Sequence, residues 1–511
     1  MQKQIFVCFI VLLALLSCTD GDRQPYQDIT PEALSMMKVP EYELNNEKIR
    51  GQIIRLTKSE TYSSAAVRFV RGYYYGGNKF IWIDRHGINP RADTLLSFIS
   101  RVGEMGFRKE IFRVAQIEED LRRVRQLDFD KPANTVNKVF ARLEYNLSRA
   151  FMRYSAGQKF GFVNPSVILN REPEDDSEGA RMVYKHQFDI RIEHPTESFY
   201  NNAIATAGGG NIGEFLRGVQ PKRKLYKQLQ EHLNSGNLSE SEWLATLCNM
   251  ERCRWREKMT EEDCGKYVFV NIPSFVLNAV DGDSTLTMRM CCGANKTKTP
   301  LLTSEIIRID LNPMWNVPHS IAKNIAGSIG YMERNNMFIY DVKKGVLPAS
   351  EASRELILDG KQRIVQEGGN GNALGRIIFR FNNNFSVYLH HTSTPWAFQS
   401  ANRAISHGCV RVEKPYELAV FLMKDKDMDL ARKIRYSMTY EVRKDSEGNV
   451  IGPKIKKDSI VRNVKVTPHV PVFITYYTIY PDKNGNMVKF RDVYGYDKRI
   501  IKQLKQFATR R

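Results

Sequence analysis

Residues 405–412 place a nucleophile and possible bases close together along the chain. This stretch reads ISHGCVRV and contains His407 and Cys409. Nineteen residues before Cys409, the stretch SVYLHHT supplies His390 and His391. A cysteine needs a nearby base to form thiolate, and histidine is the usual base near neutral pH. The residue types therefore allow a cysteine–histidine catalytic pair, a metal site, or a buried thiol beside partly satisfied histidines.

The stretch SVYLHHT is predicted to be a strand, which limits the histidines that can act together. Successive strand residues point to opposite faces, so His390 and His391 cannot both face one site. His407 and Cys409 are two residues apart, which is not a usual zinc spacing. Gly408 permits a tight backbone approach that could aim amides at a developing oxyanion. We therefore expect no metal, while the catalytic pair and the buried thiol both remain open.

The two stretches together resemble the signature of the YkuD-domain L,D-transpeptidases, bacterial enzymes that cross-link peptidoglycan. The family pattern has a histidine on a strand and, after a long loop, [ST]-H-G-C-[IV]-R. Here it reads YLHHT and then SHGCVRV. Further segments resemble the larger periplasmic branch of the family, the YcbB type: NPMWNVP (312–318), Thr299-Pro300, Gly330-Tyr331, Leu374-Gly375-Arg376 and YYTIYPDKNGNMVKFRDVYGYD. The resemblance is strong over about 267–497 and weak over 55–265.

The resemblance implies a role for each matched residue. Cys409 matches the nucleophile, and His390 matches the general base that takes and returns its proton. The remaining matched positions are expected in the oxyanion or substrate region: Ser406, His407, Gly408, Arg411, Tyr388 and Trp315. His391 stands where glycine or aspartate is commoner in the family, so its role stays open.

The implied reaction is acyl transfer between two peptidoglycan stem peptides, a donor and an acceptor. The Cys409 thiolate would attack the donor at its third residue, D-alanine would leave, and an acceptor amine would resolve the thioester. No metal or organic cofactor is implied, and carbapenems would acylate Cys409. Two alternatives remain: hydrolysis, D-amino-acid exchange or protein attachment from the same thioester, and a non-catalytic wall-binding scaffold lipoprotein.

The N-terminus is predicted to be a lipoprotein signal. Lys3 is followed by an apolar run from Ile5 to Leu16 that is too short to span a bilayer, and then by Ser17-Cys18. This resembles the bacterial lipoprotein cleavage box, in which Cys18 becomes the lipidated N-terminus. We expect residues 1–17 to be removed, 18–50 to form a tether, and the protein to be periplasmic and lipid-anchored in the cell envelope.

The predicted fold class is α+β multidomain, with a mostly helical scaffold domain at 51–265 and a β-rich catalytic domain at 266–511. In EIFRVAQIEEDLRRVRQLDF, apolar residues recur every three or four positions, as on one face of a helix. The same pattern is repeated by Val139, Phe140, Leu143, Leu147 and Phe151. Ser239, with Glu242 three residues later, is predicted to cap a helix from about 240 to 256. From residue 267, YVFVNIPSFVLNAV with Asp281-Gly282-Asp283 predicts a hairpin, and Asn484-Gly485 predicts another. A helical cap insertion is expected at about 315–370.

Residues 170–215 are predicted to be loops. Within them Gly208, Gly210 and Gly213 formally match G-x-G-x-x-G. A dinucleotide site needs a buried strand before that motif and an acidic residue about 20 positions later. Neither is present here, because the preceding residues are Asn-Asn-Ala-Ile-Ala-Thr-Ala and position 233 is leucine. The motif is therefore interpreted as part of a loop.

The net charge of +19 fits attraction to a polyanion such as a membrane surface or a carboxylate-bearing wall. Nucleic acid is not expected as a partner, because no binding motif supports it. Cys264 could pair with Cys248 or Cys253, or all of these could be buried thiols together with Cys291 and Cys292.

Overall fold

A computed structural model describes residues 43–510, except 61–63, 85–86, 131, 174–180, 425–426, 441–442, 445–449 and 452–455. The expected signal peptide and Cys18 lie outside the described residues, so both stay predictions. Within these ranges, no helix combines the length and the apolar character needed to cross a membrane. The chain divides into two compact units: the first holds Met1–Arg101, Lys109–Ser155 and Glu197–Gly218, and the second holds Val102–Arg108, Ala156–Thr196 and Val219–Arg511. The expected domain boundary at residue 265 stays a prediction.

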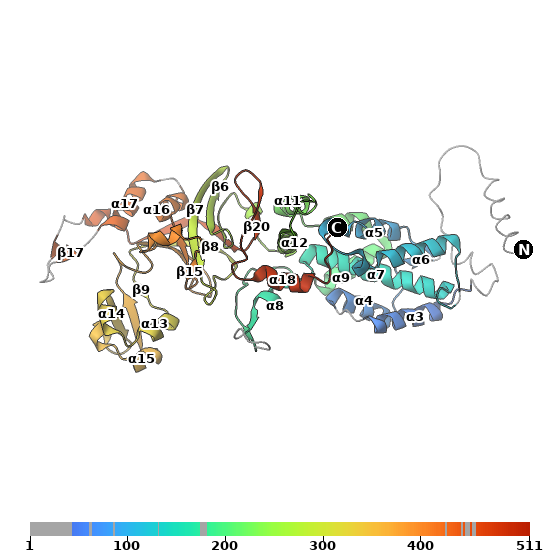
Figure 1. Ribbon diagram of the computed structural model, residues 1–511, viewed down its shortest axis with the longest axis horizontal. Coiled ribbons are helices and arrows are strands. Elements are labelled where there is room, and N and C mark those ends of the chain that lie inside the picture. Colours follow the sequence, from blue (N-terminus) through green and yellow to red (C-terminus); the bar gives the residue numbers. More distant parts are fainter. Residues whose placement is uncertain are drawn as a thin grey trace, which may run out of the picture. The chain divides into compact units, whose positions relative to one another are not determined.

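The first unit is helical, as the sequence predicts. Its helices, coloured from blue to green in Figure 1, are α3 (Asn46–Ser59), α4 (Ala65–Tyr75), α5 (Arg91–Ile99), α6 (Val114–Gln126), α7 (Val136–Phe160, with 156–160 in the second unit), α9 (Glu197–Gly209) and α10 (Ile212–Gly218). A short hairpin, β1 (Ile83–Asp84) and β2 (Gly87–Ile88), and the 3-10 turn η3 (Lys109–Phe112) complete it.

The predicted helical stripe on α6 is buried. Val114, Ile117, Leu121 and Val124 all face the core of the first unit. On α7, the expected apolar positions Val139, Phe140, Leu143, Leu147 and Phe151 are likewise buried. Each such side chain stabilises the fold by roughly 1.5–3 kcal/mol relative to exposure. The period of 3.6 residues therefore predicted both helices and their inward faces.

The prediction of loops over 170–215 was wrong in part. α9 and α10 lie there, and β3 (Arg171–Pro173) pairs with β4 (Met182–Tyr184) in the second unit. α9 was missed because two of its four buried positions, Ala203 and Ala207, are alanines, which give only a weak apolar signal. The G-x-G-x-x-G match spans the junction of two helices, and a helix rather than a strand precedes it. This excludes the dinucleotide motif, which requires a preceding strand.

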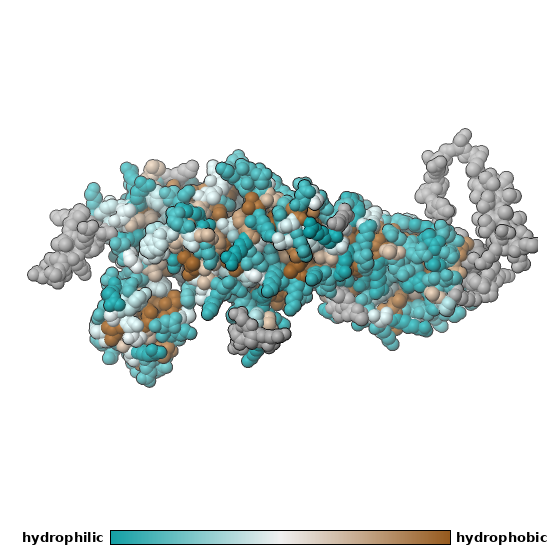
Figure 2. Space-filling model, in the orientation of Figure 1, coloured by the Kyte–Doolittle hydropathy of each residue, from teal (hydrophilic) through white to brown (hydrophobic). Residues whose placement is uncertain are grey.

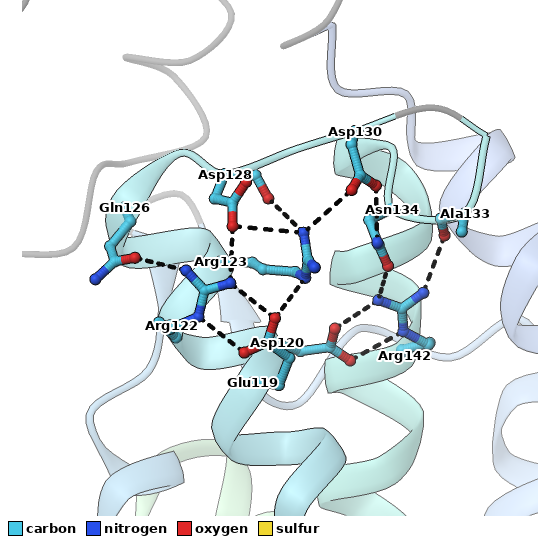
Figure 3. A network of polar contacts seen from close by, with 10 residues as sticks. All are labelled: Glu119, Asp120, Arg122, Arg123, Gln126, Asp128, Asp130, Ala133, Asn134 and Arg142. Carbon is cyan, nitrogen blue, oxygen red and sulfur yellow. Dashed lines mark hydrogen bonds and ion pairs between the residues drawn. The ribbon is translucent and has the colours of Figure 1, made fainter.

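An ionic network fixes the connection between α6 and α7 (Figure 3). Arg122 Nη2 lies 2.7 Å from both Glu119 Oε1 and Asp128 Oδ2. Arg142 forms a two-point pair with the fully buried Asp120, at 3.0 and 2.5 Å. Each exposed ion pair contributes little to stability, whereas the buried charge of Asp120 would be destabilising without Arg142. The network therefore holds this end of the first unit in place.

The second unit contains helices and short 3-10 turns that precede the sheet or follow it in the chain. These are η2 (Val102–Met105), α8 (Pro165–Leu169), α11 (Lys224–Leu233), α12 (Glu240–Arg254), η4 (Glu261–Asp263) and α18 (Tyr496–Leu504). The predicted cap of α12 is confirmed, because the Ser239 side chain accepts from the backbone N–H of Glu242 at 3.3 Å. The buried Arg252 of this helix pairs with Asp497 at 2.6 Å. α12 is therefore tied to the C-terminal part of the chain.

The centre of the second unit is a nine-stranded sheet in the order β15-β7-β16-β14-β13-β8-β19-β5-β6. An additional β7–β6 pairing returns the ladder to β7, so the strand pairings form a ring. The strands are β5 (Lys266–Asn271), β6 (Val276–Asp281), β7 (Ser284–Gly293), β8 (Leu302–Leu311), β13 (Ile377–Phe381), β14 (Leu389–His390), β15 (Ala404–Ser406), β16 (Val410–Val412) and β19 (Asn463–Thr475). The predicted hairpin at Asp281-Gly282-Asp283 joins β6 to β7.

The insertion contains the expected helices and also a four-stranded sheet that the expectation of a helical cap missed. Its elements are β9 (Trp315–Asn316), α13 (His319–Ile325), α14 (Ile329–Arg334), β10 (Met337–Asp341), β11 (Gly345–Leu347), η5 (Ala349–Glu351), α15 (Arg354–Leu358) and β12 (Gln362–Gln366). Its sheet order is β11-β10-β12-β9. The small core includes Met332, Ile339 and Ile364. These strands were missed because each is only two to five residues long.

The remaining elements of the second unit follow the insertion in the chain. They are η6 (Pro395–Gln399), α16 (Pro415–Leu422), α17 (Met428–Thr439), β17 (Arg443–Lys444), β18 (Val450–Ile451), η7 (Lys457–Ser459), β20 (Ile479–Pro481) and β21 (Met487–Lys489). The predicted Asn484-Gly485 hairpin is confirmed by the pairing of β20 with β21. The thiols of Cys248, Cys253, Cys264, Cys291 and Cys292 are all free. The suggested pairing of Cys264 with Cys248 or Cys253 is therefore not formed.

Candidate active site

Strand register brings the catalytic candidates to one face of the sheet. β14 runs parallel to β16, with His390 opposite Arg411 and Leu389 opposite Val410. Cys409 precedes β16, and the backbone N–H of Val410 donates to Tyr388 at 2.9 Å. Residues paired across strands share a face, as do residues two apart along a strand. Cys409, Arg411 and His390 therefore lie on the same side, although nineteen residues separate the cysteine from the histidine.

His390 is buried and held in one tautomer. Its Nδ1 lies 3.3 Å from the carbonyl oxygen of Leu374, which can only accept a hydrogen bond. Nδ1 must therefore carry the proton, and the lone pair of Nε2 remains free to act as a base. Burial, followed by the charge of Arg411, lowers the pKa of His390 to about 4. Leu374 acts through its backbone, so its side chain carried no signal for this role.

Cys409 is half-buried, and its thiol is neutral at rest. Burial raises the pKa of the Cys409 thiol, against the smaller opposing effects of the Tyr388 backbone N–H and the Arg411 charge. Its Sγ lies 3.7 Å from the carbonyl oxygen of Ser386. Thiol and imidazole are therefore both uncharged near neutral pH, which suits proton transfer during attack rather than a standing ion pair.

The turn before Cys409 is fixed by hydroxyl groups. Gly408 has a φ of +115°, which is a conformation that L side chains rarely adopt. Its carbonyl accepts from Thr299 Oγ1 at 2.8 Å, and its N–H donates to Ser406 Oγ at 3.2 Å. Thr297 Oγ1 donates to the carbonyl of Ser406 at 2.9 Å. The two threonines were missed as site residues, although Thr299-Pro300 belongs to a segment that resembles the family.

Arg411 connects the site to the loop that follows His390. Its Nη1 donates to Thr394 Oγ1 at 3.1 Å. Thr394 in turn lies 2.9 Å from the hydroxyl of the buried Thr392. The Nε of Arg411 is buried without a protein partner. The guanidinium is thus oriented by the fold beside the catalytic face.

The other predicted site residues lie in different surroundings. Tyr388 stacks under Arg380, whose Cζ lies 5.0 Å from the ring centre. His407 is exposed. Trp315 packs against the core of the insertion. His391 accepts from the backbone N–H of Arg376 at 3.2 Å, so it has a structural partner of its own. Strand pairing and the hydrogen bonds of the turn therefore unite Cys409, His390, Arg411, Tyr388, Ser406 and Gly408, but not His407 or Trp315.

A buried carboxylate supports the loop that holds the nucleophile turn. Glu172 on β3 pairs with Lys298, and also with Arg499 at 3.3 Å and Lys185 at 3.4 Å. Burial alone would raise the pKa of Glu172, but Lys298 and the other cations hold it below its usual range. Lys298 stands between Thr297 and Thr299. The β3–β4 hairpin therefore braces the segment that bonds to Ser406 and Gly408.

The site offers no metal-ligand cluster. In the described ranges, no group of three or more His, Cys, Asp or Glu side chains could hold a metal ion. The separate partners of His390 and His391 agree with the opposite-face argument from the sequence. The arrangement is suited to nucleophilic acyl transfer by one cysteine and one histidine.

Two parts of the chain match known protein families. Residues 68–233 match the family described as "Scaffold domain", and residues 265–435 match the family YkuD, described as "L,D-transpeptidase catalytic domain". A Haemophilus influenzae protein named "Putative L,D-transpeptidase" is 27% identical over 321 residues, which cover 61% of this chain and 60% of that protein. The crystal structure of L,D-transpeptidase 3 from Mycobacterium tuberculosis has a TM-score of 0.16 at 12% identity, covering 30% of this chain and 53% of that one, and adds nothing to the assignment. The chain therefore contains a YkuD-family L,D-transpeptidase catalytic domain, preceded by a scaffold domain.

Proposed function

We propose that this protein cross-links peptidoglycan stem peptides through their third-position residues, with a thioester on Cys409 as the intermediate. The observation that carries the proposal is the shared face of Cys409 and His390 on paired regions of the sheet. That pair lies within the matched L,D-transpeptidase catalytic domain. The match supports transpeptidation in general, and the cysteine mechanism and the type of cross-link are our proposal.

The first half-reaction forms the acyl-enzyme. His390 Nε2 takes the proton of the Cys409 thiol as the sulfur attacks the carbonyl carbon of the third residue of the donor. The C–N bond to the terminal D-alanine then breaks. The leaving amine receives the proton from His390, and a thioester remains on Cys409. Because His390 has a pKa of about 4, it is a weak base that readily returns this proton.

The second half-reaction releases the cross-link. An amine from a neighbouring stem attacks the thioester carbonyl and gives its proton to His390. The C–S bond breaks, and the thiolate recovers the proton from the imidazole. Arg411 lies on the same face as His390, and its positive charge suits contact with a carboxylate of the substrate.

A soluble assay tests the reaction. Purified protein is incubated with a disaccharide tetrapeptide that ends in D-alanine, and products are separated by liquid chromatography and mass spectrometry. We expect free D-alanine and a dimer joined through third residues, and no product with Cys409→Ala. Cys264→Ala, which changes a free thiol away from this turn, is the matched control and should remain active. Equal dimer formation by the Cys409→Ala variant would contradict the proposal.

The same assay separates the alternatives. A tripeptide without any dimer indicates hydrolysis, and incorporation of an added D-amino acid indicates exchange. Attachment to a protein amine would appear only when such an acceptor is supplied. No turnover together with no carbapenem adduct on Cys409 would favour a wall-binding scaffold lipoprotein. We expect a carbapenem to add to wild-type protein and not to Cys409→Ala.

We also propose an envelope location from the sequence. Residues 1–17 would direct export, and Cys18 would carry the lipid that tethers the protein to a bacterial membrane. Cells that express the full chain are fed a clickable palmitate analogue and fractionated. We expect label on the wild type in the membrane fraction and none on Cys18→Ser. Equal labelling of both proteins would contradict lipidation at Cys18.

A further inference from the structure

The two connections between the insertion and the catalytic sheet meet at one buried amide. Asn372 is 1% exposed. Its Nδ2 donates to the carbonyl of Pro313, on the incoming connection, at 3.3 Å. The same nitrogen donates to the carbonyl of Glu367, on the outgoing connection, at 2.8 Å. One side chain therefore joins both ends of the insertion.

The backbone approach at this point is close. A Cβ placed on Gly368 would lie 2.2 Å from the carbonyl oxygen of Asn312, so only glycine fits. Asn312 is bonded to the catalytic sheet, because its N–H donates to the carbonyl of Arg376 at 2.8 Å. Gln366, at the end of β12, accepts from the N–H of Ala373 at 2.9 Å. These contacts hold the two connections against each other and against the catalytic sheet at one junction.

Hydrogen bonds also link the Asn372 amide to His390, the proposed catalytic base. Asn372 Oδ1 accepts from the backbone N–H of Leu374 at 2.8 Å. The carbonyl of Leu374 is the group that receives the proton-bearing Nδ1 of His390. The path from Asn372 to His390 therefore consists of two hydrogen bonds and the backbone of Leu374.

We propose that Asn372 is a positioning residue that couples the insertion to the orientation and tautomer of His390. The inference rests on the proposed role of His390 as the general base. Only an amide satisfies all three partners, because two carbonyls require donors and one N–H requires an acceptor. A carboxylate of the same size would oppose both carbonyls with an oxygen. The junction would then open, and the carbonyl of Leu374 would leave Nδ1 of His390.

The test measures the tautomer directly. Histidine is labelled with nitrogen-15, and long-range proton–nitrogen spectra are recorded above pH 6.5. The His390 signal is assigned by its loss in His390→Gln. We expect the Nδ1–H form in the wild type. In Asn372→Asp we expect a mixture or the Nε2–H form, and carbapenem acylation of Cys409 slower by about 10- to 100-fold.

A matched control comes from the insertion itself. Gln362 is also a buried amide, which donates to Asp341 Oδ2 at 3.1 Å and to the Glu351 carbonyl at 3.4 Å, and accepts from the N–H of Ser353 at 2.8 Å. Gln362→Glu makes the same chemical change away from the junction. It should leave the His390 tautomer and the acylation rate as in the wild type. Asn372→Ala, which removes the amide donors without adding charge, serves if Asn372→Asp does not fold.

The outcomes separate the two proposals. An Nε2–H form of His390 in the wild type would overturn the coupling, as would a folded Asn372 variant with unchanged tautomer and rate. A tautomer change that Gln362→Glu also produces would likewise overturn it, since the effect would then not be specific to the junction. A tautomer that changes only with Asn372, in a protein whose wild type is not acylated, would uphold the positioning role and refute the proposed catalysis.

Discussion

Burial keeps both Cys409 and His390 uncharged near neutral pH. The same burial of His390 makes the stability of the folded protein depend on pH. The pKa of His390 is about 4 in the folded protein and near 6.5 for an ordinary histidine. Between these values the unfolded chain binds the proton more readily, so stability falls as pH falls through this range and is fully present above it. The difference corresponds to a loss of up to about 3 kcal/mol, at about 1.4 kcal/mol per pKa unit.

His390→Gln should therefore flatten the pH dependence of stability. We expect the free energy of unfolding of the variant to change less between pH 6.5 and pH 4 than that of the wild type. Urea denaturation at several pH values measures it. The exposed His319→Gln serves as the control and should follow the wild type. A His390→Gln curve parallel to the wild type would mean that His390 is not held neutral by burial.

Gly408→Ala tests the backbone of the nucleophile turn. The φ of +115° should strain an alanine by about 1–3 kcal/mol and shift Cys409. We expect carbapenem acylation to slow by about tenfold or more. Gly485→Ala is the control. Gly485 also has a positive φ, of +85°, but it lies in the β20–β21 hairpin with free space around it. The control variant should lose stability without losing acylation, and equal acylation in both variants would refute the role of Gly408.

At the scale of elements, the β3–β4 hairpin supports the nucleophile turn through Glu172 and Lys298. Glu172→Gln leaves the largely buried Lys298 ammonium without its main partner, which should cost about 3 kcal/mol of stability. We also expect slower acylation, because Thr297 and Thr299 flank Lys298. Adding Lys298→Met to Glu172→Gln should restore part of the lost stability, measured by thermal melting, and part of the lost acylation rate. No recovery in the double variant would contradict a specific pair.

The elements that the sequence predicted are those in which a long segment keeps one apolar period, or in which a distinctive turn joins two strands. α6, α7 and the hairpins at Gly282 and Gly485 belong to this group. α9 and the strands of the insertion were missed because small residues or short length hide the pattern. In the site, Cys409 and His390 stood out by residue type and spacing. Leu374 and Asn372 did not, because their roles depend on backbone groups and on a junction between distant segments.

At the scale of the whole molecule, the charge of +19 should favour contact with an anionic wall. Salt screens exposed charges, with a Debye length of about 10 Å at 0.1 M and about 3 Å at 1 M. We expect binding to isolated sacculi, measured by co-sedimentation, to fall steeply as salt rises. Acylation by a carbapenem, a small ligand held in the site, should change much less. Salt-independent sedimentation would show that charge does not drive wall binding.

The acyl-enzyme itself is the most direct test of the catalytic account. Wild-type protein is mixed with a donor tetrapeptide in the absence of an acceptor, quenched in acid, and weighed intact by mass spectrometry. The account predicts an adduct equal to the donor minus D-alanine, mapped to Cys409, removed by hydroxylamine and absent from Cys409→Ala. Donor turnover with no such adduct at any quench time, or an adduct that persists in Cys409→Ala, would contradict it.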